Sequence, residues 1–345
     1  MSSKSLVSII INNYNYEKFV EKAIDSALSQ TYDNIEVIVV DDGSTDNSKD
    51  LIQQYDSRVK TIFKENGGQA SALNAGFFAS QGDIIIFLDS DDYLFDNAVA
   101  EVMEHWRDDL SKLHYRLGVV DSENNSLDYT YPRNAKLAIG DVYKTLLSKT
   151  TYATVPTSGN AISRKALTEI FPIPEDDFKL AADNYLTTLV PFYGSVASIE
   201  TALAGYRIHQ NNRWVSATFD EGKLGKYVQH DLLRDRLLIE KAEQFGYEMP
   251  KDFELRFFGR LWSRLASLRL NFSNHPIPSD NRLNLTFSGL ISLWKYSDLT
   301  PLRRAIYSVW FVWVGIMPLS LARPAVIWLF SPQARPKLLK MMVSN

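Results

Sequence analysis

The group of residues with the clearest chemical potential in this 345-residue sequence is three carboxylates, Asp89, Asp91 and Asp92. They follow directly on the uninterrupted apolar run 84–88. Carboxylates packed this closely repel one another unless a cation sits among them. Oxygen ligands with few nitrogen partners suit Mg²⁺ or Mn²⁺, ions usually shared with a phosphate-bearing substrate. The stretch therefore predicts a metal site, with a solvated acidic turn as the alternative.

The elements around the carboxylates help to decide between these readings. The run 84–88 predicts a strand buried on both faces, and residues 6–11, 35–40 and 59–63 predict three more strands. Apolar residues at helical spacing predict helices over about 17–29, through 51–55 and through 70–78. Strands and helices that alternate over about ninety residues predict a parallel sheet with helices on both faces.

Polar residues follow several of the predicted strands. The segment 12–15 follows the first strand, Asp41 and Asp42 follow the second, and the acidic group follows the fourth. Parallel strands end at one edge of the sheet, where open α/β folds bind ligands. Neither G-x-G-x-x-G nor G-x-x-x-x-G-K-[ST] follows the first strand. We therefore expect carboxylates to grip a nucleotide through ribose hydroxyls, base N–H groups and a metal.

The composition narrows the classes of protein. With 45% hydrophobic and 23% charged residues, the chain is globular and large enough for two domains or for one domain with an appendage. A net charge of −4 gives no general attraction to nucleic acid. The absence of cysteine excludes disulfides, thiolate zinc sites and cysteine nucleophiles, and fits a reducing compartment. The apolar run 6–11 is too short for a signal peptide.

Several segments together resemble the family 2 glycosyltransferases with the GT-A fold, in the family's order and spacing. These segments are residues 8–15, 29–32, 36–46, 66–68, 74–76 and 82–92. The resemblance implies an α/β fold with a Rossmann-like, mixed or mostly parallel sheet flanked by helices. It implies transfer of a sugar, with inversion, from a UDP-, GDP- or dTDP-linked donor. It also implies Mg²⁺ or Mn²⁺. Leu73 departs from the family, because many members have Arg there.

The same resemblance implies roles for individual residues. Asp42 would contact the nucleobase, and Asp89 and Asp91 would form the Asp-x-Asp element that binds ribose and metal. His209 and Asp92 are further candidates for the metal, although a lone histidine is more often a packed or surface residue. The remaining nucleotide-binding candidates are Asn12, Tyr14, Asn66 and Ser90.

The catalytic base implied by the resemblance is Asp183, at the start of a predicted helix. A carboxylate there is favoured by the helix dipole, which also tends to keep it ionised. Asp176 and Asp177 are rivals for this role, and a helix-capping acid is the structural alternative.

The C-terminal third has a different character. We expect residues 1–215 to form the GT-A domain, with a nucleotide-sugar half (1–100) and an acceptor half (101–215), and residues 216–345 to form a helical region. Residues 305–322 carry no charge, and basic residues flank them: Arg303, Arg304, Arg323, Arg335, Lys337 and Lys340. The region around 303–340 therefore predicts interfacial, non-spanning membrane attachment. A buried helical hairpin or a homo-oligomer interface is the alternative.

Three functions follow from these observations. The first is glycosyl transfer to a glycan or lipid-linked acceptor in cell-surface polysaccharide synthesis, in the cytoplasm or peripherally on the inner face of the membrane. The second is a sugar-phosphate nucleotidyltransferase, which should carry a basic Gly-rich loop where this chain has residues 12–15. The third is a non-catalytic, membrane-tethered scaffold, against which the retained aspartates argue.

Overall fold

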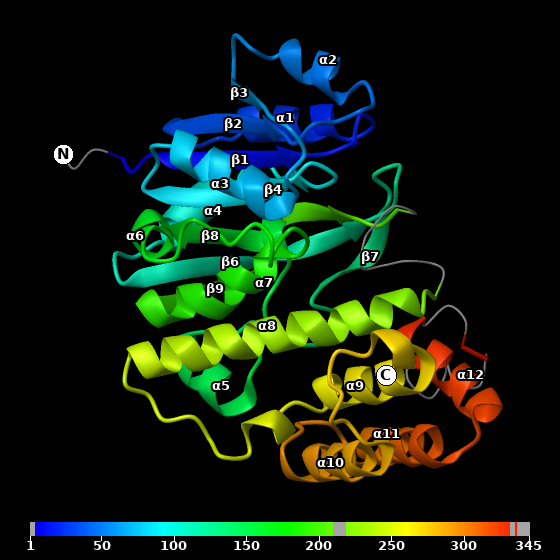
Figure 1. The fold of residues 1–345 in the computed structure, drawn as a ribbon. Helices are drawn as coiled ribbons and strands as arrows, with labels where there is room; N and C mark the ends of the chain where they lie inside the picture. Colours follow the sequence, from blue (N-terminus) through cyan, green and yellow to red (C-terminus); the bar gives the residue numbers. More distant parts are fainter. Residues whose placement is uncertain (1–3, 210–218, 332–334, 337–345) are drawn as a thin grey trace. The chain divides into compact units, whose positions relative to one another are not determined.

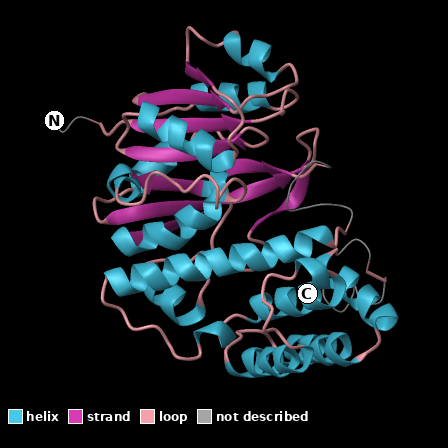
Figure 2. Cartoon of the chain, viewed as in Figure 1, coloured by secondary structure: helices cyan, strands magenta, loops and turns pink. Residues whose placement is uncertain are grey.

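The computed structural model describes residues 4–209, 219–331 and 335–336. Its contacts divide the chain into two compact units, residues 1–144 with 152–209 and residues 145–151 with 210–345. The first unit is an α/β structure and the second is helical (Figure 2). The domain boundary predicted after residue 215 lies outside the described residues.

A mixed sheet forms the centre of the first unit (Figure 1). Its strands follow the order β3-β2-β1-β4-β8-β6-β9-β5, and β7 pairs with β6. The strands are β1 Val7–Asn13, β2 Ile35–Asp41, β3 Lys60–Phe63, β4 Ile84–Asp89, β5 Tyr93–Leu94, β6 Leu110–Val120, β7 Ser126–Tyr131, β8 Asn160–Ser163 and β9 Ser195–Arg207.

The parallel half of the sheet brings the predicted polar residues together. β1 lies between β2 and β4, and both pairings are parallel. Asn12 stands opposite Asp89, and Asn13 stands opposite Asp41. The predicted α/β fold class is confirmed. The sheet becomes mixed beyond β4, because β8 runs antiparallel to both β4 and β6.

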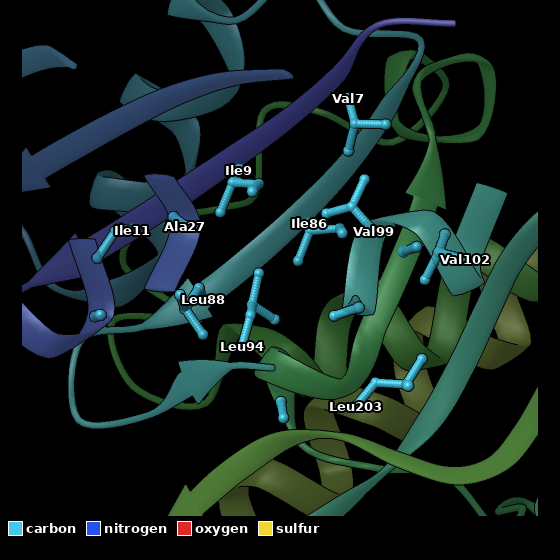
Figure 3. Packing of buried hydrophobic residues seen from close by; sticks show 14 of the residues in the cluster. Val7, Ile9, Ile11, Ala27, Ile86, Leu88, Leu94, Val99, Val102 and Leu203 are labelled. Atoms are coloured by element: carbon cyan, nitrogen blue, oxygen red, sulfur yellow. The ribbon is translucent and has the colours of Figure 1, made fainter. Parts of the chain in front are cut away.

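Helices cover both faces of this sheet, as the alternating pattern predicts. Side chains of α1 and α4 pack in one apolar cluster with β1 and β4 (Figure 3). On the other face α3 lies close to β1 and β2, since a Cβ on Gly76 would overlap with Ile10 Cγ2. The helices with bounds in the first unit are α1 Val20–Leu28, α2 Ser48–Gln53, α3 Gln69–Ala79, α4 Ala98–His105, α6 Arg164–Thr168 and α7 Ala182–Leu189. A further helix, α5, spans Val142–Lys149.

Five α-helices lie wholly within the described part of the second unit: α8 Gly222–Gln244, α9 Phe258–Leu270, α10 Arg282–Lys295, α11 Pro301–Ile316 and α12 Leu319–Phe330. The uncharged run 305–322 is not one helix, because α11 ends before Pro318 and α12 begins after it. None of the helices in the described ranges combines the length and the apolar character that crossing a bilayer requires. Lys337 and Lys340 lie outside the described residues.

Candidate active site

The carboxyl ends of β1, β2 and β4 form a hydrogen-bonded polar edge. Asn12 Nδ2 donates to Asp89 Oδ1 at 2.9 Å, and Asn13 Nδ2 donates to Asp41 Oδ2 at 2.8 Å. Ser44 completes the Asp41 site through its backbone N–H (2.9 Å) and its hydroxyl (2.6 Å). The strand ends are therefore held in register by amide–carboxylate pairs as well as by the backbone ladder.

Asp42 organises the glycine turn that precedes α3. Its carboxylate accepts hydrogen bonds from Lys64 Nζ (2.7 Å) and from the N–H groups of Gly67 (3.0 Å) and Gly68 (2.6 Å). Gly68 has a φ of +91°, and a Cβ there would stand 2.5 Å from the backbone oxygen of Lys179. Asn66, an exposed residue, donates to the backbone oxygen of Asp42. The nucleobase contact proposed for Asp42 stays a prediction beside this structural role.

Asp91 lies against His209, a residue that follows β9. Asp91 Oδ2 and His209 Nε2 are 3.0 Å apart, and both side chains are nearly buried. The imidazole packs on Phe19, with ring centroids 5.0 Å apart, and meets Tyr16 edge-on. The structure therefore brings together two of the predicted metal-binding residues, which are separated by more than a hundred positions in the sequence.

Asp92 is buried, and its carboxylate is bound by protein groups. Its carboxylate accepts the Ser158 hydroxyl at 2.6 Å and the Arg207 backbone N–H at 2.9 Å. The Arg207 guanidinium donates to the Asp91 backbone oxygen at 2.7 Å and lies over the Phe19 ring. Asp92 thus fastens the acidic loop to β9, and its carboxylate is committed to protein donors.

The electrostatics of the acidic loop favour a bound cation. Burial and then the negative charge of Asp91 raise the pKa of Asp89 to about 6. Burial, reinforced by Asp91 and Asp89, also raises the pKa of Asp92 well above its usual value. In the described part of the chain, no three His, Asp or Glu side chains form a metal cage by themselves. The residues fit a hard cation that takes its other ligands from phosphate and water.

Gln69 connects the acidic edge to α7. Its Nε2 donates to Asp89 Oδ1 at 3.2 Å, and its Oε1 accepts the N–H of Ala182, the first residue of α7, at 3.1 Å. Ala181 adopts a left-handed backbone (φ 63°, ψ 44°) just before the helix. That conformation costs an alanine about 1–2 kcal/mol. The Gln69 side chain therefore holds both the strained turn at Ala181 and the Asp89 carboxylate.

Asp183 occupies the first turn of α7 and shares a small pocket with Lys112. Lys112 is fully buried on β6, and its Nζ donates to Tyr152 Oη (3.1 Å) and Thr154 Oγ1 (2.8 Å). Burial lowers the pKa of Lys112 to about 7, and the charge of Asp183 opposes that fall. The rival acids Asp176 and Asp177 lie exposed on the loop before α7.

Two tyrosines lie near both acidic groups. Tyr131, at the end of β7, and Tyr206 on β9 have ring centroids 5.9 Å apart. Burial and then the charge of Asp183 raise the pKa of Tyr131. Burial and then Asp92, Asp91 and Asp89 raise the pKa of Tyr206. The pair therefore lies within electrostatic reach of both the acidic loop and Asp183.

Buried polar atoms without partners mark the same edge. Among the described residues, Asn12 Oδ1 and Ser90 Oγ are buried and accept or donate no hydrogen bond. Leaving such an atom unpaired costs about 1–3 kcal/mol, which a polar ligand could recover. Tyr14, just after β1, is half-buried.

Sequence reasoning missed four residues of this arrangement: Gln69, Lys112, Ser158 and Arg207. The first three lie in stretches with no acidic or repeated pattern. Arg207 stands in the Tyr-Arg-x-His segment that drew attention to His209, so that a signal for it was present.

Comparisons with known proteins give a consistent result. A model described as glycosyl transferase family 2 matches residues 8–171. An uncharacterized glycosyltransferase of Nostoc sp. is 35% identical over 216 residues, which are 61% of this chain and 67% of the relative. An uncharacterized glycosyltransferase of Rickettsia conorii is 41% identical over 137 residues, 37% of this chain and 22% of that relative. The chain thus spans about two thirds of the first relative and about a fifth of the second.

Solved structures share the fold at low sequence identity. S. aureus TarS 1–349 in complex with UDP-GlcNAc has a TM-score of 0.53 and 15% identity, over 95% of this chain and 92% of that one. Mannosyltransferase PcManGT from Pyrobaculum calidifontis, in complex with GDP-Man and Mn²⁺, has a TM-score of 0.50 and 16% identity, over 100% of this chain and 89% of that one. At such identities the likeness shows the fold alone.

Proposed function

The chain belongs to glycosyl transferase family 2, and on that basis we propose that it moves a sugar, with inversion, from a nucleoside diphosphate to an acceptor hydroxyl. The observation that carries the proposal is the hydrogen-bonded link from Asp89 through Gln69 to the first turn of α7, which bears Asp183. A donor held at Asp89 and an acceptor held at Asp183 would meet at one edge of the sheet. Family membership sets aside the nucleotidyltransferase alternative.

In this proposal Asp183 accepts the proton of the acceptor hydroxyl while that oxygen attacks C1 of the donor sugar. The bond from C1 to the diphosphate oxygen breaks, the nucleoside diphosphate leaves with the bonding electrons, and the anomeric configuration inverts. Asp91, with Asp89 and His209, would hold Mg²⁺ or Mn²⁺, which when bound neutralises charge on the leaving diphosphate. Asn12 Oδ1 and Ser90 Oγ, which are buried without partners, support a polar nucleoside at this edge.

The acceptor in this proposal is a glycan or a lipid-linked sugar used in cell-surface polysaccharide synthesis. Tyr131 supports the binding of an acceptor sugar beside Asp183, the proposed catalytic base. The tyrosine ring is partly exposed and lies within the electrostatic field of Asp183. An aromatic face can stack on the apolar face of a sugar.

Binding of nucleotides tests the donor side. We expect one of UDP, GDP, dTDP and CDP to raise the Tm of the full chain only when Mn²⁺ is present. A ligand at a hundredfold excess over its Kd stabilises the folded state by about 2.7 kcal/mol. The measurement is thermal unfolding with each nucleotide, with and without Mn²⁺. Absence of any shift, together with absence of nucleoside diphosphate release, would favour the non-catalytic scaffold.

Substitution of Tyr131 tests the acceptor side. We expect Tyr131→Ala to raise the acceptor KM about three- to tenfold and to leave the donor KM unchanged, since only the stacking contact is lost. Tyr129→Ala is the matched control, because the Arg133 guanidinium already covers the Tyr129 ring at 4.8 Å. Equal effects of the two substitutions would argue against a stacking role for Tyr131.

A further inference from the structure

The solvent-facing side of α10 is apolar. Leu283, Phe287, Ile291 and Trp294 are all exposed, and Phe287 keeps 63% of its surface accessible. Their spacing of three and four residues places them along one side of the helix. The opposite side, which includes Leu285 and Leu293, is buried in the core of the second unit. A surface helix usually has polar residues on its solvent-facing side, and α10 has apolar residues there instead.

The next helix repeats this arrangement. Leu302, Val309, Val312, Trp313 and Ile316 are the exposed large side chains of α11, and Val309 keeps 66% of its surface accessible. These positions also fall on one side of a 3.6-residue helix. Phe311 and Val314, on the other side, are buried in the same core as Leu285.

Hydrogen bonds of two indole groups join the neighbouring elements. Trp294 Nε1 on α10 donates to Ser308 Oγ on α11 at 3.0 Å. Trp313 Nε1 on α11 donates to the backbone oxygen of Leu321, in the first turn of α12, at 2.9 Å. α10 and α11 lie side by side in the helical unit (Figure 1). We call the exposed apolar side chains of these two helices the α10–α11 face.

The charge around the α10–α11 face is positive. Arg282 and Lys295 are exposed and stand directly before and after the apolar residues of α10, and Lys295 Nζ lies 3.5 Å from Asp252 Oδ2. Residues 299–331 contain Arg303, Arg304 and Arg323 and no Asp or Glu, and Asp298, just before them, pairs with Lys149 at 2.6 Å. The Arg323 guanidinium pairs with Glu221 at 2.6 Å, so its charge is partly used within the unit.

We propose that the α10–α11 face docks this protein on the surface of an anionic lipid bilayer, with both helices lying in the plane of the interface. Exposed tryptophans suit the headgroup level of a membrane, and flanking basic residues suit anionic headgroups. The proposal extends the sequence-based expectation to α10, a helix that lies before the segment 303–340.

A second copy of the chain is the competing occupant. A two-fold interface through this face would bring two copies of the same patch together, so the basic groups of one copy would face a patch of the same charge sign. Anionic headgroups instead neutralise these charges. The charge therefore favours a membrane over a dimer.

Sedimentation of the full chain with lipid vesicles tests the proposal. We expect binding to vesicles that contain phosphatidylglycerol and weaker binding to phosphatidylcholine alone. Phe287→Ser combined with Val309→Ser should weaken binding about tenfold or more, because apolar area is withheld from the lipid. Arg282→Gln should weaken binding to the anionic vesicles about fivefold, and Lys295→Gln should weaken it less, because the Lys295 ammonium already pairs with Asp252.

Phe78→Ser is the matched control, since Phe78 is 65% exposed on α3 of the other unit. It should bind vesicles as the unchanged chain does, and thermal unfolding should show that every variant is folded. Two results would overturn the proposal. One is no binding to either vesicle type by the full chain. The other is a dimer, seen by analytical ultracentrifugation, that dissociates on Phe287→Ser with Val309→Ser while vesicle binding is unchanged. The assay contains no nucleotide sugar, so its failure would leave the proposed reaction untouched.

Discussion

Replacing Asp183 by asparagine is expected to lower kcat by about 10²–10⁴-fold, the usual contribution of a general base. Asparagine has nearly the same shape, and its Oδ1 can still accept the N–H of Asn184, as Asp183 Oδ1 does at 2.9 Å. The first turn of α7 and its bond to Gln69 should therefore persist. Release of nucleoside diphosphate measures the rate, and calorimetry with the donor should show unchanged affinity.

Asp176→Asn and Asp177→Asn are the matched controls for Asp183→Asn, because these acids lie exposed on the preceding loop. Both should retain near-normal rates. If Asp183→Asn kept a normal rate while one loop variant lost activity, the base would belong to the loop.

Lys112 gives a structural reason to expect Asp183 to act as an ionised base. The buried ammonium shares a pocket with Asp183, and its other partners are the neutral hydroxyls of Tyr152 and Thr154. Because the pKa of Lys112 is lowered to about 7, its positive charge is strongest below neutral pH. There the ammonium attracts the negative charge of Asp183, and this attraction fades as the pH rises above 7.

Replacing Asp91 by asparagine is expected to abolish metal-dependent donor binding. Carboxylate oxygens are the ligands that Mg²⁺ and Mn²⁺ prefer. The amide oxygen of asparagine carries no negative charge to balance the positive charge of the metal ion. Loss of a contact that merely supports a metal ligand already costs about 10–100-fold. We therefore expect turnover to fall by more than about 100-fold. Calorimetry should give the same donor affinity with Mn²⁺ as without it.

The stability of Asp91→Asn separates loss of binding from loss of folding. Asp91 raises the pKa of both Asp89 and Asp92, so its negative charge opposes theirs in the metal-free protein. The variant should consequently unfold at the same temperature as the unchanged chain or at a higher one. Asp33→Asn, a change at an 89% exposed side chain, is the control for the substitution itself. Donor binding that still required Mn²⁺ at unchanged affinity would show that Asp91 does not hold the metal.

Sequence patterns predicted the first part of the fold well because its contacts repeat a local rule. The apolar runs that became β1, β2 and β4 are long enough to be buried on both faces, and a helix follows each of the first two. The order of the later strands could not be predicted from such a local rule. β8, a four-residue strand, inserts antiparallel between β4 and β6, and nothing in residues 160–163 indicates either neighbour.

The same limit applies to the candidate site. Asp89 and Asp91 could be found because three acids follow one strand, and Asp183 through a family resemblance. Gln69 could not be found, because a glutamine at the start of a helix has no distinctive pattern. Its importance comes from Ala182, which is distant in sequence and approaches only when the sheet is assembled.

The long separation between the acidic loop and its partners also affects how the protein is made. Asp92 accepts a hydrogen bond from Arg207, which follows it by 115 residues in the sequence. Asp91 contacts His209, which follows it by 118 residues. At about 5–20 residues per second, the acids precede their partners in synthesis by roughly ten seconds. On the ribosome, the growing chain thus carries three neighbouring carboxylates before β9 exists to hold them. The contacts that hold Asp91 and Asp92 are therefore completed only when nearly the whole first unit has been translated.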